Sequence, residues 1–242
     1  MPLRLGRRVF APTARLTLLT LLLAAACVRL GLWQWHKWVH AEAQWARFAR
    51  GAEAVQPLGA RALPEVALFQ RVSLSGRLDG AHQFLLDNRS WRGRAGYEVL
   101  TPLARSDGRM LLVDRGWVPF TGSRRRLPAV ALPDTGEVSL SGRVADLPSP
   151  GLASGRAPPP RTAPWPKVTS FPAMDDLAEA LGHALDARIL LLDPQAPFGF
   201  VREWQPPGLA PLRYLGYAIQ WWCFAALALV LWAIMSLRTA AP

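Results

Sequence analysis

The feature that most constrains this chain is an apolar segment of membrane-spanning length near each end. Residues 214–237 carry no charged side chain, and residues 16–35 carry a single charge, on Arg29. About 20 apolar residues are needed to cross the hydrocarbon core of a bilayer. The sequence therefore predicts two transmembrane helices, with everything between them, residues 36–213, on one side of the membrane.

The arginines that flank the two segments predict their orientation. Four arginines and no acidic residue precede the first segment. Short flanks rich in Arg and Lys stay in the cytoplasm, whereas long loops are translocated largely regardless of charge. Residues 1–15 and 238–242 are thus predicted to be cytoplasmic, and the middle periplasmic, in a bacterial inner membrane. A cleaved signal peptide or a mitochondrial transit peptide is the alternative. The stretch before the first apolar segment is short, which favours an uncleaved anchor.

Charge and cysteine content exclude several classes of protein. The formal net charge of +11 comes partly from the anchoring arginines, and the remaining basic residues are mixed with all 17 acidic ones. No basic patch interleaved with aromatic residues results, which argues against nucleic acid as a partner. The cysteines, Cys27 and Cys223, both lie in the predicted spans. A disulfide framework and a thiol-based copper site are therefore excluded.

The middle of the chain predicts a mainly β domain. Residues 72–77 read Val-Ser-Leu-Ser-Gly-Arg, and the same letters recur at residues 138–143 without matching flanks. Such alternation before a glycine is typical of a half-buried strand. Other strands are predicted at residues 83–87, 97–103, 109–117 and 189–192, and a helix at residues 174–185. Strands on both sides of one helix indicate an α+β domain with a mainly antiparallel sheet.

No catalytic constellation accompanies these elements. The four histidines occur without a metal-binding spacing, a nucleophile elbow or a phosphate-binding glycine loop. A membrane-tethered enzyme is therefore disfavoured, and no residue is nominated as catalytic.

The candidate binding residues lie where the first span meets the domain. If the helix continues past the span, Trp33, His36 and His40 fall along one face. Gln34 lies among them. An aromatic belt at the lipid interface explains the tryptophan. It does not explain the amide and imidazole groups, because polar groups at membrane depth are costly and indicate function.

The second span opens with a corresponding stripe. Tyr214, Tyr217 and Trp221 repeat at helical spacing, and Gln220 adds another polar group. Two helices facing each other with these side chains would suit a flat aromatic macrocycle that needs an axial ligand. Imidazole and tyrosinate both ligate haem iron, so Tyr214 or His36 is the predicted iron ligand and the other residues are predicted to line the haem.

Four stretches of the chain together carry a family resemblance. They are Leu30-Gly-Leu-Trp-Gln34; Asn88-Arg89 with Gly96-Tyr97 and Thr101-Pro102-Leu103; Leu112-Val-Asp-Arg-Gly-Trp-Val-Pro119; and Tyr217-Ala-Ile-Gln-Trp221. With the two-span layout, they resemble the Surfeit locus protein family of membrane-bound assembly factors for cytochrome c oxidase.

The resemblance implies a non-catalytic protein that binds haem a or aids its insertion into the haem-bearing oxidase subunit. Haem a synthase or other assembly factors are the further partners that it implies. The alternative is a scaffold that docks on oxidase subunits without binding haem.

The sequence departs from the family pattern at the position that matters most. The family typically has a histidine, proposed to ligate haem, where this chain has Tyr214, and an asparagine where it has Asp114. The resemblance leaves Tyr214 as the substitute ligand, with His36 or His40 as alternatives. Arg115-Gly116-Trp117 is interpreted as support of the fold, through a glycine bulge and a core tryptophan, ahead of direct partner contact.

Overall fold

The computed structural model describes residues 3–5, 8–51, 54–134, 136–149 and 157–239. The chain forms two compact units. One contains Met1–Ala46 and Gly208–Pro242, and the other contains Arg47–Pro207.

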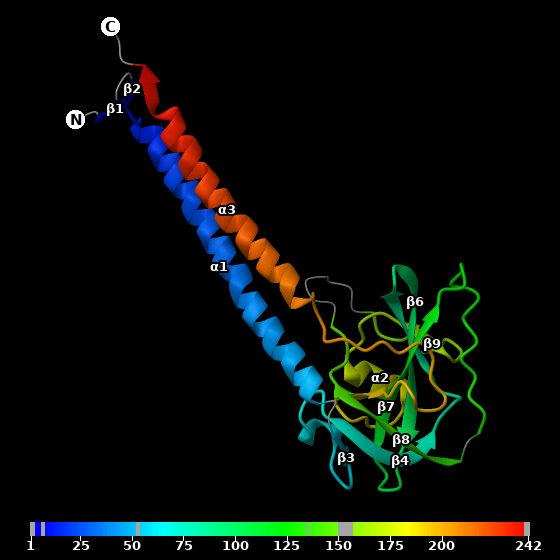
Figure 1. Ribbon diagram of the computed structural model, residues 1–242. Coiled ribbons are helices and arrows are strands. Elements are labelled where there is room, and N and C mark those ends of the chain that lie inside the picture. Colours follow the sequence, from blue (N-terminus) through cyan, green and yellow to red (C-terminus); the bar gives the residue numbers. More distant parts are fainter. Residues whose placement is uncertain (1–2, 6–7, 52–53, 135, 150–156, 240–242) are drawn as a thin grey trace. The chain divides into compact units, whose positions relative to one another are not determined.

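The first unit is built on two antiparallel helices, α1 (Ala14–Arg50) and α3 (Pro211–Met235), which lie side by side in Figure 1. Both are long and apolar enough to cross a membrane. At one end of the pair the Trp232 indole donates a hydrogen bond to the Thr17 hydroxyl at 3.1 Å. The α1 helix continues far past the apolar segment, so the condition under which Trp33, His36 and His40 were placed on one face is met.

Small side chains form the seam between the two helices. Thr20, Ala24, Cys27 and Gly31 are the buried residues of this part of α1, at alternating spacings of four and three. This is the period at which one face of a helix stays against a partner. A β-carbon on Gly31 would lie 2.2 Å from Nε1 of Trp222 on α3. The helices therefore approach closely because the seam lacks bulk.

A small antiparallel sheet joins the two ends of the chain. Its strands are β1 (Leu3–Leu5), β2 (Arg8–Phe10) and β11 (Leu237–Thr239), in the order β1-β2-β11. The backbone that precedes α1 is thus hydrogen-bonded to the backbone that follows α3.

The second unit is an eight-stranded sheet in the order β3-β4-β8-β10-β7-β6-β5-β9. The strands are β3 (Val55–Pro57), β4 (Arg71–Leu78), β5 (Phe84–Trp91), β6 (Arg94–Ala104), β7 (Met110–Pro119), β8 (Glu137–Ala145), β9 (Lys167–Thr169) and β10 (Ile189–Leu192). A further pairing of β4 with β6 closes the five strands β4, β8, β10, β7 and β6 into a ring. A short 3-10 helix, η1 (Leu63–Glu65), precedes β4.

The sheet is mixed, with a majority of antiparallel pairs. The pairs β3–β4, β10–β7 and β5–β9 are parallel, and the other pairs are antiparallel. With the apolar helices near the two termini and a helix in the domain, this confirms the predicted α+β class. The strands predicted from the sequence are all present, whereas β3 and β9, of three residues each, were not predicted.

The domain helix α2 (Met174–Leu181) is shorter than predicted. It ends at Gly182, whose left-handed conformation (φ 76°) stops the helix before Leu185. Leu177 packs it into a buried cluster with Phe84 and Ile189 of the sheet.

The repeated hexapeptides are neighbours in the sheet. They form the middle of β4 and of β8, which pair antiparallel with Leu74 opposite Leu140. The two serines that flank each leucine also face each other across the pair. The repetition therefore reflects two strands with the same role, as the sequence predicted.

Candidate functional site

Within the helical unit, Lys37 brings together two of the predicted site residues. Its Nζ atom lies 3.8 Å from the ring centre of Trp33 on α1 and 6.0 Å from that of Tyr214 on α3. A cation within about 6 Å of an aromatic ring is attracted to the negative face of that ring. The side chains of Trp33, Lys37 and Tyr214, called the aromatic–lysine cluster below, therefore join the two helices on one flank of their seam.

Tyr214 is half-buried at the start of α3. Its hydroxyl oxygen accepts a hydrogen bond of 3.3 Å from the backbone N–H of Leu209. The hydroxyl proton remains free to be donated or lost, since a phenol is both a donor and an acceptor.

Gln34 and Trp38 continue the seam beyond Gly31. The Oε1 atom of Gln34 and the Nε1 atom of Trp38 are buried and make no hydrogen bond to any part of the chain that the structure describes. Trp38 stacks against Trp35 at 4.5 Å, and Trp35 lies 5.9 Å from Trp222 of α3. Buried polar atoms without partners are uncommon in native proteins, so this segment has unused hydrogen-bonding capacity.

The two histidines of the predicted site are exposed. A helix turns by about 100° per residue, which places His36 roughly 160° from Gln34 and His40 about 60° from Lys37. The structure therefore brings His40, rather than His36, toward the flank that carries the aromatic–lysine cluster.

The remaining predicted residues of α3 are less closely grouped. Tyr217 is 45% exposed, and Gln220 is also exposed. Trp221 packs against the small residues of the seam and against Phe224. Of the eight predicted site residues, Trp33 and Tyr214 thus share a contact residue, Lys37, which is not among the eight. A lysine one helical turn after a tryptophan was the available signal.

In the second unit, Arg115 is buried and holds three parts of the chain together. Its Nε atom donates to the Phe198 carbonyl at 2.7 Å, and its Nη1 atom donates to Gln83 Oε1 at 2.7 Å and to the Val130 carbonyl at 3.3 Å. Burial, and then the positive charge of Arg202, lower the pKa of Arg115 to about 10. With 3% of its surface exposed, this side chain is committed to the interior.

Gly116 and Trp117 complete the same motif. Gly116 has a φ of 109°, and a β-carbon there would lie 2.5 Å from the Val201 carbonyl oxygen. This close approach allows Trp117 and Val201 to exchange two backbone hydrogen bonds, of 2.8 and 3.2 Å. Trp117 is 7% exposed and stacks on Trp91. The geometry of the motif is that of an internal brace between β7 and the segment that leads to α3.

Asp114, which precedes the motif, belongs to a buried charged cluster. It lies with Glu98 and Arg89 on the wall of a cavity of about 350 Å³. Burial, followed by the negative charge of Glu98, raises the pKa of Asp114 well above its ordinary value. Burial also raises the pKa of Glu98, whose ion pair with Arg89 (3.1 Å) acts in the opposite direction. Asp114 is therefore held as the neutral acid at pH values where exposed aspartates are ionised.

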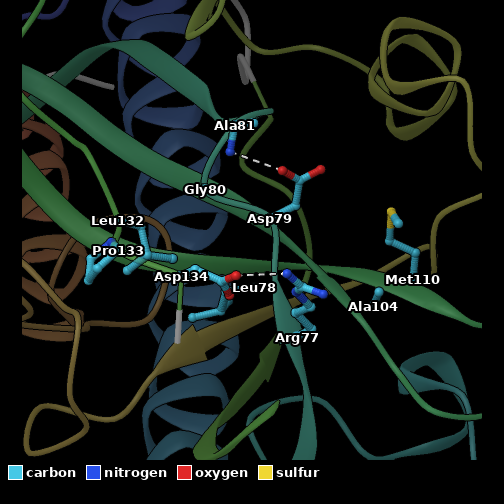
Figure 2. A pocket seen from close by; sticks show the side chains of 10 residues that line it. All are labelled: Arg77, Leu78, Asp79, Gly80, Ala81, Ala104, Met110, Leu132, Pro133 and Asp134. Atoms are coloured by element: carbon cyan, nitrogen blue, oxygen red, sulfur yellow. Dashed lines mark hydrogen bonds and ion pairs between the residues drawn. The ribbon is translucent and has the colours of Figure 1, made fainter. Parts of the chain in front are cut away.

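A separate cavity of about 480 Å³, shown in Figure 2, contains none of the predicted site residues. Arg77 and Asp134 form an ion pair of 2.9 Å at its wall, and Asp79 accepts a hydrogen bond from the Ala81 N–H at 2.9 Å. The side chains of Arg77 and Asp134 are 66% and 71% exposed. A pair so exposed contributes little, and this cavity is a surface hollow.

Across the described ranges of the chain, no group of three or more His, Cys, Asp or Glu side chains could hold a metal ion.

Comparisons with known proteins give one family. A family model described as the SURF1 family matches residues 21–226, from within α1 to within α3. A SURF1-like protein from Dictyostelium discoideum is 45% identical over 53 residues, which are 22% of this chain and 20% of that protein. The chain therefore spans about a fifth of the length of this curated relative.

Proposed function

We propose, because this chain belongs to the SURF1 family, that it is a membrane-bound assembly factor for cytochrome c oxidase. Membership of that family is consistent with a role in oxidase assembly. In this proposal the protein binds haem a and aids its insertion into the haem-bearing subunit. The haem is cargo in this proposal, held briefly and passed on. Haem a synthase or another assembly factor supplies it.

The observation that carries the proposal is the aromatic–lysine cluster. The rings of Trp33 and Tyr214 offer flat apolar faces to a macrocycle. The Lys37 ammonium between them is a charge-assisted donor for a propionate carboxylate. The phenol of Tyr214 and the exposed imidazole of His40 are the groups on this flank that can ligate iron. His36, the other predicted ligand, lies about 60° from Trp33 and about 100° from Lys37 around α1, farther from the cluster than His40.

The location of this cluster follows from the arrangement proposed for the spans. The arginines before α1 favour a cytoplasmic N-terminus and hence a periplasmic domain in a bacterial inner membrane. The cluster lies late in α1 and early in α3, where each helix leaves the apolar segment. A haem bound there would be level with the outer interface of the bilayer.

The test is an absorption spectrum of the full-length protein, purified in maltoside detergent from cells that make haem a. We expect a Soret band that is weakened in Tyr214→Phe and Lys37→Met. Tyr97→Phe is the control, because it removes the same hydroxyl from a tyrosine on β6, in the second unit. A wild-type protein without a Soret band would refute haem binding.

A scaffold that never binds haem is the second candidate. It is favoured by the exposure of His36 and His40, since neither imidazole makes a hydrogen bond or ring contact with Tyr214 among the described residues. A scaffold should copurify with oxidase subunits from cells that lack haem a synthase, and Tyr214→Phe should leave that copurification unchanged. A haem carrier should lose its Soret band in the same cells.

A further inference from the structure

The domain contains a second, unrelated concentration of charge. A cavity of about 380 Å³ is lined by three arginines, Arg71, Arg143 and Arg202, and by Phe48 and Asp193. This cavity is called the arginine pocket below. The three arginines come from β4, from β8 and from the segment after β10, so the fold of the second unit alone brings them together.

Two of the three arginines occupy directly opposite positions. Arg71 on β4 and Arg143 on β8 are register partners in the antiparallel pair. Like charges directly opposite each other destabilise a sheet. The arrangement therefore needs compensating negative charge.

Asp193 provides that compensation for one arginine. It is 4% exposed and binds Arg71 through two hydrogen bonds, from Nε at 3.2 Å and from Nη2 at 2.5 Å. It also accepts a hydrogen bond of 2.6 Å from the Ser141 hydroxyl. Its oxygens are thus already engaged on their side of the pocket.

The other two arginines are held in place by neutral groups. Arg143 stacks on the Phe48 ring at 4.0 Å and donates to the Phe48 carbonyl at 2.5 Å. Arg202 donates to the carbonyls of Asp193 and Ala196 at 2.6 and 2.9 Å. Within the described ranges, neither guanidinium has a carboxylate at ion-pair distance.

Glu203, the other acidic residue at the wall of the cavity, does not pair with Arg143 or Arg202. Glu203 is paired with Arg92 at 2.7 Å. Burial, followed by the charge of Arg71, lowers the pKa of Arg143, and burial lowers that of Arg202. The negative charge of Asp193 acts in the opposite direction on both groups, but that carboxylate already binds Arg71, so Arg143 and Arg202 share its charge with a third guanidinium group.

We propose that the arginine pocket binds a ligand that carries a phosphate group. The planar fork of an arginine matches the oxygens of a phosphate, and several such forks can share one anion. An anion between Arg143 and Arg202 would add to the negative charge of Asp193, which these two arginines share with Arg71. The volume exceeds that of a phosphate ion and lies in the range of small-molecule sites, about 300–1,000 Å³. The phosphate can belong to a soluble compound or to a lipid headgroup.

The test uses the full-length protein in maltoside micelles, which present no phosphate. Inorganic phosphate is titrated by calorimetry at constant ionic strength set with chloride. We expect saturable binding that weakens at least about tenfold in Arg143→Gln and in Arg202→Gln, because each removes a charged donor. Arg125→Gln is the matched control, since it removes the same charge from an exposed arginine outside the pocket.

Two further measurements sharpen the outcome. Arg143→Lys keeps the charge and the fold but loses the fork, and it should also weaken phosphate binding, which separates recognition from general destabilisation. Added phosphatidylglycerol should displace phosphate if the natural ligand is a headgroup, and should leave its binding unchanged if the ligand is soluble. Phosphate binding that is absent, or equal in wild type and both Gln variants, would overturn the proposal.

Discussion

Replacing Asp114 by Asn should remove a loss of folding stability that the domain suffers as the pH rises. Asp114 is 1% exposed, and its Oδ1 atom accepts a hydrogen bond of 2.9 Å from the Gly116 N–H. An asparagine has the same shape and can accept the same bond, but it never ionises. The variant therefore isolates the cost of placing a negative charge beside Glu98.

The sign follows from the raised pKa of Asp114 in the folded protein. The folded state holds this proton more tightly than the unfolded state, so the stability it contributes is complete below the unfolded pKa, about 3.9. That stability is lost as the pH rises from there through the folded pKa. Over this window one proton separates the two states, and the free energy of unfolding of wild type falls by up to about 1.4 kcal/mol per pH unit relative to Asp114→Asn.

The measurement is the melting temperature of the detergent-solubilised protein, followed by tryptophan fluorescence from pH 4 to pH 8. For a domain of this size 1 kcal/mol corresponds to roughly 2–4 °C, so the two curves should diverge by about 3–5 °C per pH unit in the window. Asp175→Asn, at an exposed carboxylate, should run parallel to wild type. Parallel curves for wild type and Asp114→Asn would show that Asp114 is ionised in the fold and that the reasoning is wrong.

Three other substitutions test the close contacts. Gly31→Ala should destabilise the helix pair by about 1–3 kcal/mol by overpacking, because the new β-carbon would lie 2.2 Å from the Trp222 indole. Gly216→Ala, whose β-carbon would meet nothing within 4 Å, should not destabilise the pair. Thermal melting and protease resistance compare the two variants. Gly116→Ala should lower the free energy of unfolding by about 2 kcal/mol or more, because of its strained backbone and the Val201 carbonyl that the β-carbon would meet. Gly108→Ala, whose β-carbon would lie in open space, should lower it by about 1 kcal/mol in the same melting assay. Arg115→Met should leave the Phe198 carbonyl without a donor and cost about 1–3 kcal/mol, seen as a lower melting temperature, because Gln83 Oε1 and the Val130 carbonyl each keep a second donor.

Much of the domain fold could be predicted because its strands carry strong local patterns. The alternation in residues 72–77 and 138–143 places their leucines on the buried face, and the structure confirms both strands. The strands β3 and β9 could not be predicted, because three residues are too few for a period to show. The early end of α2 is set by Gly182, whose effect is local and could have been recognised.

The candidate site was harder to predict because α1 is apolar over most of its circumference. Aromatic and ionisable residues at the stripe of Trp33, His36 and His40 drew attention to one face. The structure places the seam on another face, where small residues allow close packing. The spacing of Ala24, Cys27 and Gly31 was the signal for it, since small residues mark contacts between membrane helices.

The pairing of β4 with β8 also has a consequence for how the chain can misfold. The segment Val-Ser-Leu-Ser-Gly-Arg binds a copy of itself in antiparallel register, with leucine against leucine and serine against serine. Each copy is therefore self-complementary, and two newly made chains could pair through it before either closes its own ring. Slow or crowded synthesis should favour such strand-exchanged dimers, in which the same hydrogen bonds connect different molecules.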